Sequence, residues 1–254
     1  MVVMKQQSDY GYDAPYALVA FIVLGTISAV AAMVSWILGG ELTGMMAFYG
    51  AFFLANASSF LYTTRRGKFQ VWEDILNGLH LRGDERVLDM GCGRGAVLTA
   101  VAKRLTTGRV TGIDLWSSKD QSGNARAVTL QNAAAEGVRD RIEIETGDMR
   151  QLPFPDGSFD VVVSSLAIHN IPSNEARARA VTEAWRVLKP GGRLAIADIR
   201  VTGRYAKTLS SLGAADVAQR RLGWRFWYGN PAAATSLVTA VKRQPALTAG
   251  RPVP

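Results

Sequence analysis

The chain has 254 residues, with 29 basic and 21 acidic side chains, a net charge of +8 and one cysteine, Cys92. One cysteine excludes an internal disulfide, and with only two histidines it argues against a structural zinc site. Residues 1–62 carry a net −2 and the rest of the chain +10. Beside an apolar N-terminus, this surplus favours anionic membrane lipid over nucleic acid as a partner. An ordinary solvated basic surface is the alternative.

Two apolar stretches near the N-terminus predict a pair of transmembrane helices. Residues 16–38 and 42–62 are each long enough to cross a hydrocarbon core of about 30 Å as helices. A linker of only three residues predicts a tight antiparallel hairpin. A cleaved signal peptide fits poorly because a second apolar stretch follows. A buried helical hairpin of a soluble protein is the other alternative.

Flanking charges predict the orientation of the hairpin. Lys5 precedes the first stretch, Arg65 and Arg66 follow the second, and the linker holds only Glu41. The positive-inside rule therefore places both ends, and the rest of the chain, in the cytoplasm. A row of small residues at every fourth position predicts the face that packs against the first helix, namely Ala47, Ala51, Ala55 and Ser59.

After residue 68 the pattern changes to short apolar runs alternating with longer helical stretches. The runs are residues 86–90, 110–114, 142–146, 161–165, 193–199, 217–222 and 236–242, and the helical stretches are 69–79, 97–105, 125–136 and 174–188. This alternation predicts an α/β fold with a mostly parallel sheet covered on both faces. The predicted organisation is a hairpin segment over 1–64, a catalytic domain over 65–244 and a disordered tail over 245–254.

A glycine-rich turn follows the first predicted strand. The sequence from Val87 to Gly95 reads Val-Leu-Asp-Met-Gly-Cys-Gly-Arg-Gly, and a helical stretch comes next. Glycines allow a sharp turn and a close approach of backbone to ligand, and the helix N-terminus supplies oriented N–H groups. Alone, this turn also fits a dinucleotide-binding site.

Two further carboxylates help to identify the ligand that this turn binds. Asp114 ends the second predicted strand and can accept both hydroxyls of a ribose, and Asp148 follows the third strand. With Leu188-Lys-Pro-Gly-Gly before the fifth strand, the chain resembles the class I S-adenosylmethionine-dependent methyltransferases, in particular the small-molecule branch of ubiquinone and sterol methylating enzymes. The resemblance covers about residues 70–243. It implies a Rossmann-like sheet of seven strands with the last strand antiparallel.

The resemblance also implies roles for particular residues, with S-adenosylmethionine as cofactor and no metal. Gly91 and Gly93 pass beneath the methionine part, with Asp89 near its ammonium. Asp114 holds the ribose hydroxyls and Leu115 packs on the adenine. Asp148 accepts from the adenine amino group, Met149 covers the other face of the ring, and Ser164 lies near the sulfonium.

His169 is the candidate general base, because it follows the fourth predicted strand and its ordinary pKa suits proton removal near neutrality. The alternative is a histidine that only orders its loop. With a membrane hairpin in place of the usual cap of the pocket, we expect a lipophilic small-molecule acceptor reached from the bilayer. A membrane-bound NAD-dependent oxidoreductase and a non-catalytic S-adenosylmethionine-binding protein are the rival functions. The pattern indicates no oligomeric state.

Overall fold

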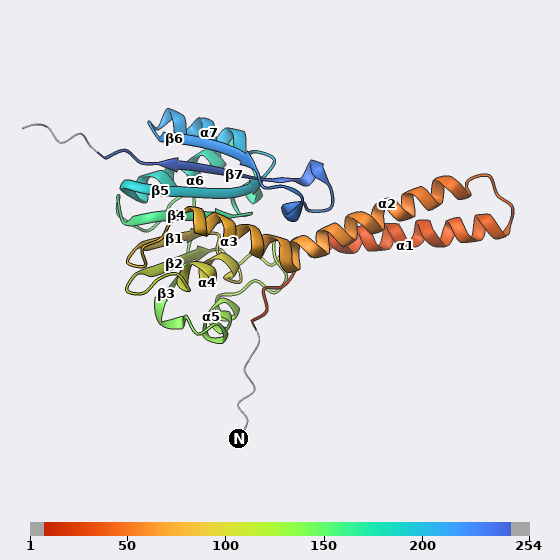
Figure 1. Ribbon diagram of the computed structural model, residues 1–254, viewed down its shortest axis with the longest axis horizontal. Helices are drawn as coiled ribbons and strands as arrows, with labels where there is room; N and C mark the ends of the chain where they lie inside the picture. Colours follow the sequence, from red (N-terminus) through yellow and green to blue (C-terminus); the bar gives the residue numbers. More distant parts are fainter. Residues whose placement is uncertain (1–7, 245–254) are drawn as a thin grey trace, which may run out of the picture.

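The computed structural model describes residues 8–244, in which a helical hairpin projects from an α/β domain (Figure 1). The hairpin consists of α1 (Pro15–Ile37) and α2 (Thr43–Tyr62). Both helices are apolar along their length, and Pro15 stands at the first turn of α1, where the missing N–H leaves no hydrogen bond unmade. The two helices contact each other where small residues let the backbones approach, at Gly25 against Leu54 and at Gly50 against Ala29.

The predicted small-residue face of the second helix was wrong. Ala47, Ala51 and Ala55 are exposed, whereas Gly50, Ala57 and Phe60 of α2 are buried. Four-residue spacing of small side chains marks a face of a helix, but it does not say which face meets the neighbour.

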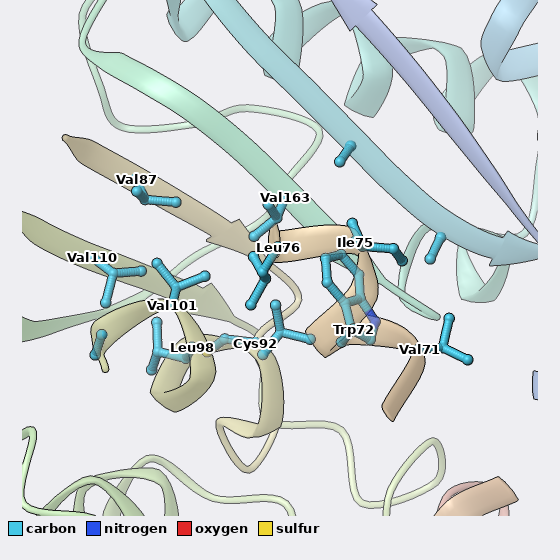
Figure 2. Packing of buried hydrophobic residues seen from close by; sticks show 14 of the residues in the cluster. Val71, Trp72, Ile75, Leu76, Val87, Cys92, Leu98, Val101, Val110 and Val163 are labelled. Atoms are coloured by element: carbon cyan, nitrogen blue, oxygen red, sulfur yellow. The ribbon is translucent and has the colours of Figure 1, made fainter. Parts of the chain in front are cut away.

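The second helix does not end where the domain begins. A π-helical turn (Thr63–Gly67) joins α2 directly to α3 (Lys68–Gly78), so the predicted boundary at residue 64 falls inside one continuous rod. Figure 2 shows Trp72, Ile75 and Leu76 of α3 within the core, near Val163 of the sheet. The hairpin is therefore fixed to the domain core by a helix and not by a flexible linker.

The domain is built on a seven-stranded sheet in the order β3-β2-β1-β4-β5-β7-β6. Its strands are β1 (Arg86–Met90), β2 (Arg109–Asp114), β3 (Ile142–Thr146), β4 (Phe159–Ser165), β5 (Leu188–Ile199), β6 (Ala215–Arg221) and β7 (Thr235–Val241). β7 runs antiparallel to both of its neighbours and the other pairs are parallel. The predicted fold class, including the antiparallel last strand, is confirmed.

Helices cover both faces of this sheet. The helices are α4 (Ala96–Ala102), α5 (Arg126–Ala135), α6 (Asn174–Val187) and α7 (Thr202–Ser211). One apolar core lies between the sheet and α3, α4 and α5, and a second lies on the opposite face under α6 and α7. α7 was not predicted, because it is mostly polar and only Thr202, Tyr205 and Leu209 of its ten residues are buried.

The order of the strands reverses between β1 and β4, where the chain leaves one side of the sheet for the other. In open α/β sheets, ligands bind outside the carboxyl ends of the strands at such a switch point. β1 ends at Met90 and β4 at Ser165, so the glycine-rich turn and the turn that carries His169 meet there.

Candidate functional site

A cavity of about 980 Å³ opens at the carboxyl ends of the strands. Nearly all of the residues predicted for the site line it: Asp89, Gly91, Gly93, Asp114, Leu115, Asp148, Met149 and His169. Its volume is at the upper end of the range for a single bound small molecule, so it has room for more than one partner.

The glycine-rich turn forms the floor of the cavity at the end of β1. Gly91 has φ +73°, and a Cβ on it would lie 2.2 Å from the Cβ of Ala167. The N–H of Gly91 donates to the carbonyl of Ile113 at 2.8 Å, which ties the turn to β2. Only glycine fits here, because both the backbone angle and the space exclude a side chain.

Asp89, the last residue but one of β1, is a buried carboxylate in this floor. Its Oδ2 atom is buried and has no hydrogen-bond partner among the described residues. Burial, and then the charge of nearby Asp114, raise the pKa of Asp89 to about 8. An unpaired buried acid beside a second carboxylate favours a cationic ligand, because a positive group would supply the missing partner.

Asp114 ends β2 and its carboxylate is held in place by backbone donors. The N–H of Gly93 donates to Oδ2 at 2.9 Å, and the N–H of Trp116 donates to Oδ1 at 2.6 Å. Asn124 donates to the same Oδ1 at 3.2 Å. The carboxylate thus links the glycine-rich turn to the segment after β2 while it faces the cavity.

The residues predicted around the adenine lie on the same side of the cavity. Leu115 is 62% exposed although it lines the cavity, so an apolar surface is available for a flat ring. Asp148 accepts hydrogen bonds from Arg150, which lowers the pKa of Asp148 below its ordinary value and keeps it ionised. Met149 lies close to Gly91, on the wall above the turn.

Ser164 does not line the cavity. Its side chain is buried and its hydroxyl donates to the carbonyl of Met90 at 2.8 Å. The neighbouring Ser165 does line the cavity, and its hydroxyl accepts from the indole N–H of Trp72 at 2.8 Å. Successive residues of a strand point to opposite faces of the sheet. The prediction therefore found the right end of β4, but Ser165 and not Ser164 lines the cavity.

His169 faces the cavity from a short 3₁₀ turn (Ile168–Asn170) after β4. Its Nδ1 atom lies 2.5 Å from Oδ1 of Asp198, a fully buried residue of β5. Oδ2 of Asp198 accepts from the backbone N–H of His169 at 3.0 Å and from the hydroxyl of Tyr205 at 3.0 Å. Asp198 was not predicted as a partner of His169, although its place near the end of the predicted strand 193–199 was a usable signal.

Two segments contact the glycine-rich turn or each other beside it: residues 8–14 near the N-terminus and the polar residues 116–124 after β2. Arg94 of the turn donates to the carboxylate of Asp9 at 2.8 Å and, through its backbone N–H, to the side chain of Gln121 at 2.8 Å. The backbone N–H of Tyr12 donates to the hydroxyl of Ser122 at 2.9 Å. Ser117 and residues 119–121 therefore line the site together with Tyr10, Asp13 and Ala14 of the N-terminal segment.

The described residues 8–244 contain no cluster of three or more His, Cys, Asp or Glu side chains that could hold a metal ion. Carboxylates, a histidine and a glycine-rich turn line the site.

The comparisons with known proteins match this geometry. Residues 88–196, from β1 to β5, match the family model described as "Methyltransferase domain". This part of the chain is therefore similar to a methyltransferase domain. This domain includes the glycine-rich turn, Asp114, Asp148 and His169, whereas the hairpin and Asp198 lie outside the matched residues.

Similar curated proteins match about half of the chain. The chain is 39% identical over 122 residues to 27-O-demethylrifamycin SV methyltransferase of Amycolatopsis mediterranei, which covers 47% of this chain and 40% of that protein. It is 37% identical over 117 residues to demethylmenaquinone methyltransferase of Lactiplantibacillus plantarum, covering 46% of each. The chain thus spans less than half the length of these relatives.

Solved structures share the fold of the methyltransferase domain. The [4+2]-cyclase SpnF superposes with a TM-score of 0.58 at 21% identity, covering 70% of this chain and 82% of that one. Geranyl diphosphate C-methyltransferase from Streptomyces coelicolor superposes with a TM-score of 0.54 at 16% identity, covering 67% and 76%. Since one neighbour is a cyclase, the fold alone does not fix the reaction.

Proposed function

We propose that this protein transfers a methyl group from S-adenosylmethionine to a small lipophilic acceptor at the cytoplasmic face of a membrane. The observation that carries the proposal is that one cavity joins Asp89 and Asp114, the candidate base His169 and the domain ends of the two hairpin helices. Cofactor, acceptor and bilayer would therefore meet in a single space.

The residues of the site fit this cofactor. The unpartnered Oδ2 of Asp89 suits the ammonium of the methionine part, and the bare backbone of Gly91 and Gly93 leaves space for that part to lie close. Asp114 would hold the ribose hydroxyls, Leu115 and Met149 would enclose the adenine, and Asp148 would accept from its amino group. When bound, the cofactor supplies a methyl group on a sulfonium, which is already activated for displacement.

His169 would take the proton of the acceptor. Its Nδ1 atom is engaged by Asp198, so the ring is held in one orientation and the other nitrogen is left for the cavity. A buried carboxylate behind a histidine also stabilises the imidazolium that forms when the ring accepts a proton. This arrangement favours an acceptor that must lose a proton, such as a hydroxyl, over one that is already nucleophilic.

The hairpin supports a membrane location. Both helices are long and apolar enough to cross a membrane, and in each case less than a quarter of the most apolar window is buried. A soluble core helix is mostly buried, whereas these two helices are mostly exposed and contact each other. Arg65 and Arg66 are exposed at the domain end of α2, which agrees with a cytoplasmic catalytic domain.

A lipophilic acceptor agrees with the names of several relatives. The chain is 35% identical over 131 residues to a ubiquinone/menaquinone biosynthesis C-methyltransferase of Ruegeria sp., covering 51% of this chain and 49% of that protein. That relative and the demethylmenaquinone methyltransferase are named for quinones. Apolar side chains of the hairpin, namely Ala17, Phe21 and Phe60, line part of the cavity, which suits a lipophilic partner.

Calorimetric titration of the detergent-purified protein with S-adenosylhomocysteine tests the cofactor. We expect micromolar binding of S-adenosylhomocysteine, no binding of NAD and loss of binding in Asp114→Ala. The control is Asp140→Ala, because Asp140 is exposed and lies outside the cavity. Binding of NAD in place of S-adenosylhomocysteine would instead support the oxidoreductase, and binding of neither would remove the proposal.

Transfer is then measured with S-adenosylmethionine labelled in its methyl group and an extract of membrane lipids. We expect label in the lipid-soluble fraction and equimolar S-adenosylhomocysteine. Binding without any transfer, to lipid or to water-soluble acceptors, would point to a non-catalytic binding protein.

A further inference from the structure

The cavity does not end at the candidate base. Beyond His169 it continues to the domain ends of the two hairpin helices, where Ala17 and Phe21 of α1 and Phe60 of α2 line it. Tyr228, Ala233 and the polar Asn230, from the segment between β6 and β7, also line this part of the cavity. We call this space, bounded by Ala17, Phe21, Phe60, Tyr228 and Ala233, the hairpin chamber.

The hairpin chamber reaches into the membrane-facing part of the protein. α1 begins at Pro15, so Phe21 stands six residues along it, about 9 Å from its start at 1.5 Å per residue. The next residues, Ile22, Val23 and Leu24, are exposed apolar side chains of the proposed span. The chamber therefore lies at the level where the hydrocarbon of a bilayer would begin.

The walls of the chamber are fixed by contacts between distant segments. The rings of Phe60 and Tyr228 meet edge to face at 5.0 Å, and those of Phe21 and Phe60 lie 6.3 Å apart. Asn56, a buried polar residue of α2, accepts a hydrogen bond from the side chain of Asn230 at 2.7 Å.

The segment between β6 and β7 also contacts Asp13 and the end of α2 near the chamber. Thr63 donates to the carbonyl of Trp227, and the hydroxyl of Tyr228 donates to Asp13 at 2.8 Å. Trp224 stacks on Tyr62 with the ring centres 5.2 Å apart. A polar residue within a membrane span is expensive unless it is paired, and Asn56 is paired to the wall of the chamber.

We propose that the hairpin chamber holds the apolar chain of the acceptor, so that the hairpin is part of the substrate site as well as an anchor. This inference rests on the proposed methyl transfer and names the shape of its acceptor: an amphiphile whose head lies at His169 and whose chain extends between α1, α2 and segment 224–234. The chain enters from the bilayer and stays in apolar surroundings. Exposing it to water instead would weaken binding about fourfold for each methylene.

Photolabelling tests where the chain lies. The probe is a phenol with a 12-carbon chain that ends in a diazirine, added to the full-length protein in nanodiscs, and labelled residues are identified by mass spectrometry. Tyr228 and Phe60 are 8% and 3% exposed, so a probe in bulk lipid cannot reach them. We expect label on these two residues.

Two variants on neighbouring positions of α1 make the result specific. Phe21→Trp fills the chamber and is expected to reduce label on Tyr228 at least fivefold. Ile22→Trp, on an exposed position of the same helix, is expected to leave it unchanged. Ala17→Phe is a second filling variant in case Phe21→Trp does not fold, which the midpoint of thermal unfolding reports.

Label confined to exposed residues such as Ile22 and Phe52, and insensitive to the filling variants, would overturn the inference. Labelling requires neither cofactor nor turnover. Labelling of Tyr228 and Phe60 can therefore fail while S-adenosylhomocysteine still binds. In that case the proposed function remains, and the hairpin is only an anchor. Conversely, the titration can fail while Tyr228 is labelled, and the proposed function is then the part that is lost.

Discussion

The Nδ1 atom of His169, in the turn after β4, lies 2.5 Å from Oδ1 of Asp198 in the neighbouring strand β5. Asp198 is completely buried, whereas the side chain of His169 is 25% exposed toward the cavity. The pair therefore has a fixed inner member and an accessible outer member. Asp198 does not line the cavity, so its effect on any reaction must pass through His169.

Asp198→Asn is predicted to lower kcat by about 100-fold, because proton transfer by a positioned base contributes about 10²- to 10⁴-fold. The affinity for S-adenosylhomocysteine should change by less than twofold. His169→Gln should lose about as much activity as Asp198→Asn, and the double variant little more. Recovery of the rate at high pH, where the acceptor ionises unaided, would distinguish loss of a base from a damaged fold.

Tyr205→Phe is the matched control for that prediction. Tyr205 donates to the other oxygen of Asp198 at 3.0 Å without touching His169, so its loss should cost about 1 kcal/mol of stability and less than tenfold in kcat. Full activity in Asp198→Asn would mean that His169 only orders its turn.

Binding of S-adenosylhomocysteine is predicted to release a proton from Asp89. With its pKa raised to about 8 by burial and by Asp114, Asp89 is protonated in the free protein at pH 7. The ammonium of the ligand favours the ionised form. Affinity should therefore rise by up to tenfold per pH unit between pH 6 and 8 and then level off. Calorimetry at pH 7 in two buffers of different ionisation enthalpy measures the proton directly.

The raised pKa of Asp89 also predicts how the stability of the protein changes with pH. The folded pKa of Asp89 lies above its value of about 3.9 in an unfolded chain, so the folded state holds the extra proton between those values. Stability of the ligand-free protein should fall by up to about 1.4 kcal/mol per pH unit from pH 4 to 8. Asp89→Asn should remove both this slope and the proton release; a titration unchanged by the substitution would contradict the assignment.

Breaking the ion pair between Lys68 and Asp13 is predicted to loosen the hairpin from the domain. The Nζ atom of Lys68 lies 2.7 Å from Asp13, and their side chains are 6% and 16% exposed. Removing one partner of a buried pair costs about 3–5 kcal/mol because the other charge is left unpaired. Lys68→Met should therefore lower the midpoint of thermal unfolding clearly.

The double variant Asp13→Asn with Lys68→Met should regain part of that loss, since neither charge is then left alone. Asp13 also accepts from Thr64 and Tyr228, so the recovery is expected to be partial. Strictly additive losses in the two single variants and the double variant would show that the pair contributes no coupling.

Most of the sheet, and the residues that gather at the cavity around the glycine-rich turn, could be predicted because their signals are local in the sequence. Asp89, Gly91 and Gly93 lie within five residues, and Asp114 directly ends an apolar run. Asp198 was missed because it meets His169 only through the pairing of β4 with β5, 29 residues away. No single stretch of the sequence shows which strands are neighbours in the sheet.

The hairpin, too, could be predicted only in part from the sequence. Its length and apolar character were evident, but the face of α2 that meets α1 was not, since small residues occur on more than one face. The continuation of α2 into α3 was also hidden, because Thr63–Gly67 is polar and carries two arginines, which are typical of a span end. The hairpin chamber depends on both features.

Gly91→Ala is predicted to destroy the cofactor site, whereas Gly78→Ala should be harmless. At Gly91 an added Cβ would lie 2.2 Å from Ala167, and φ of +73° is unfavourable for a side chain, so the turn must move. We expect a loss of about 1–3 kcal/mol of stability and at least 100-fold weaker binding of S-adenosylhomocysteine. Gly78 lies in α3 with nothing within 4 Å of an added Cβ, so alanine there should stabilise the protein by about 0.5–1 kcal/mol. Titration and thermal unfolding of both variants measure this, and tight binding by Gly91→Ala would mean that the turn does not lie beneath the cofactor.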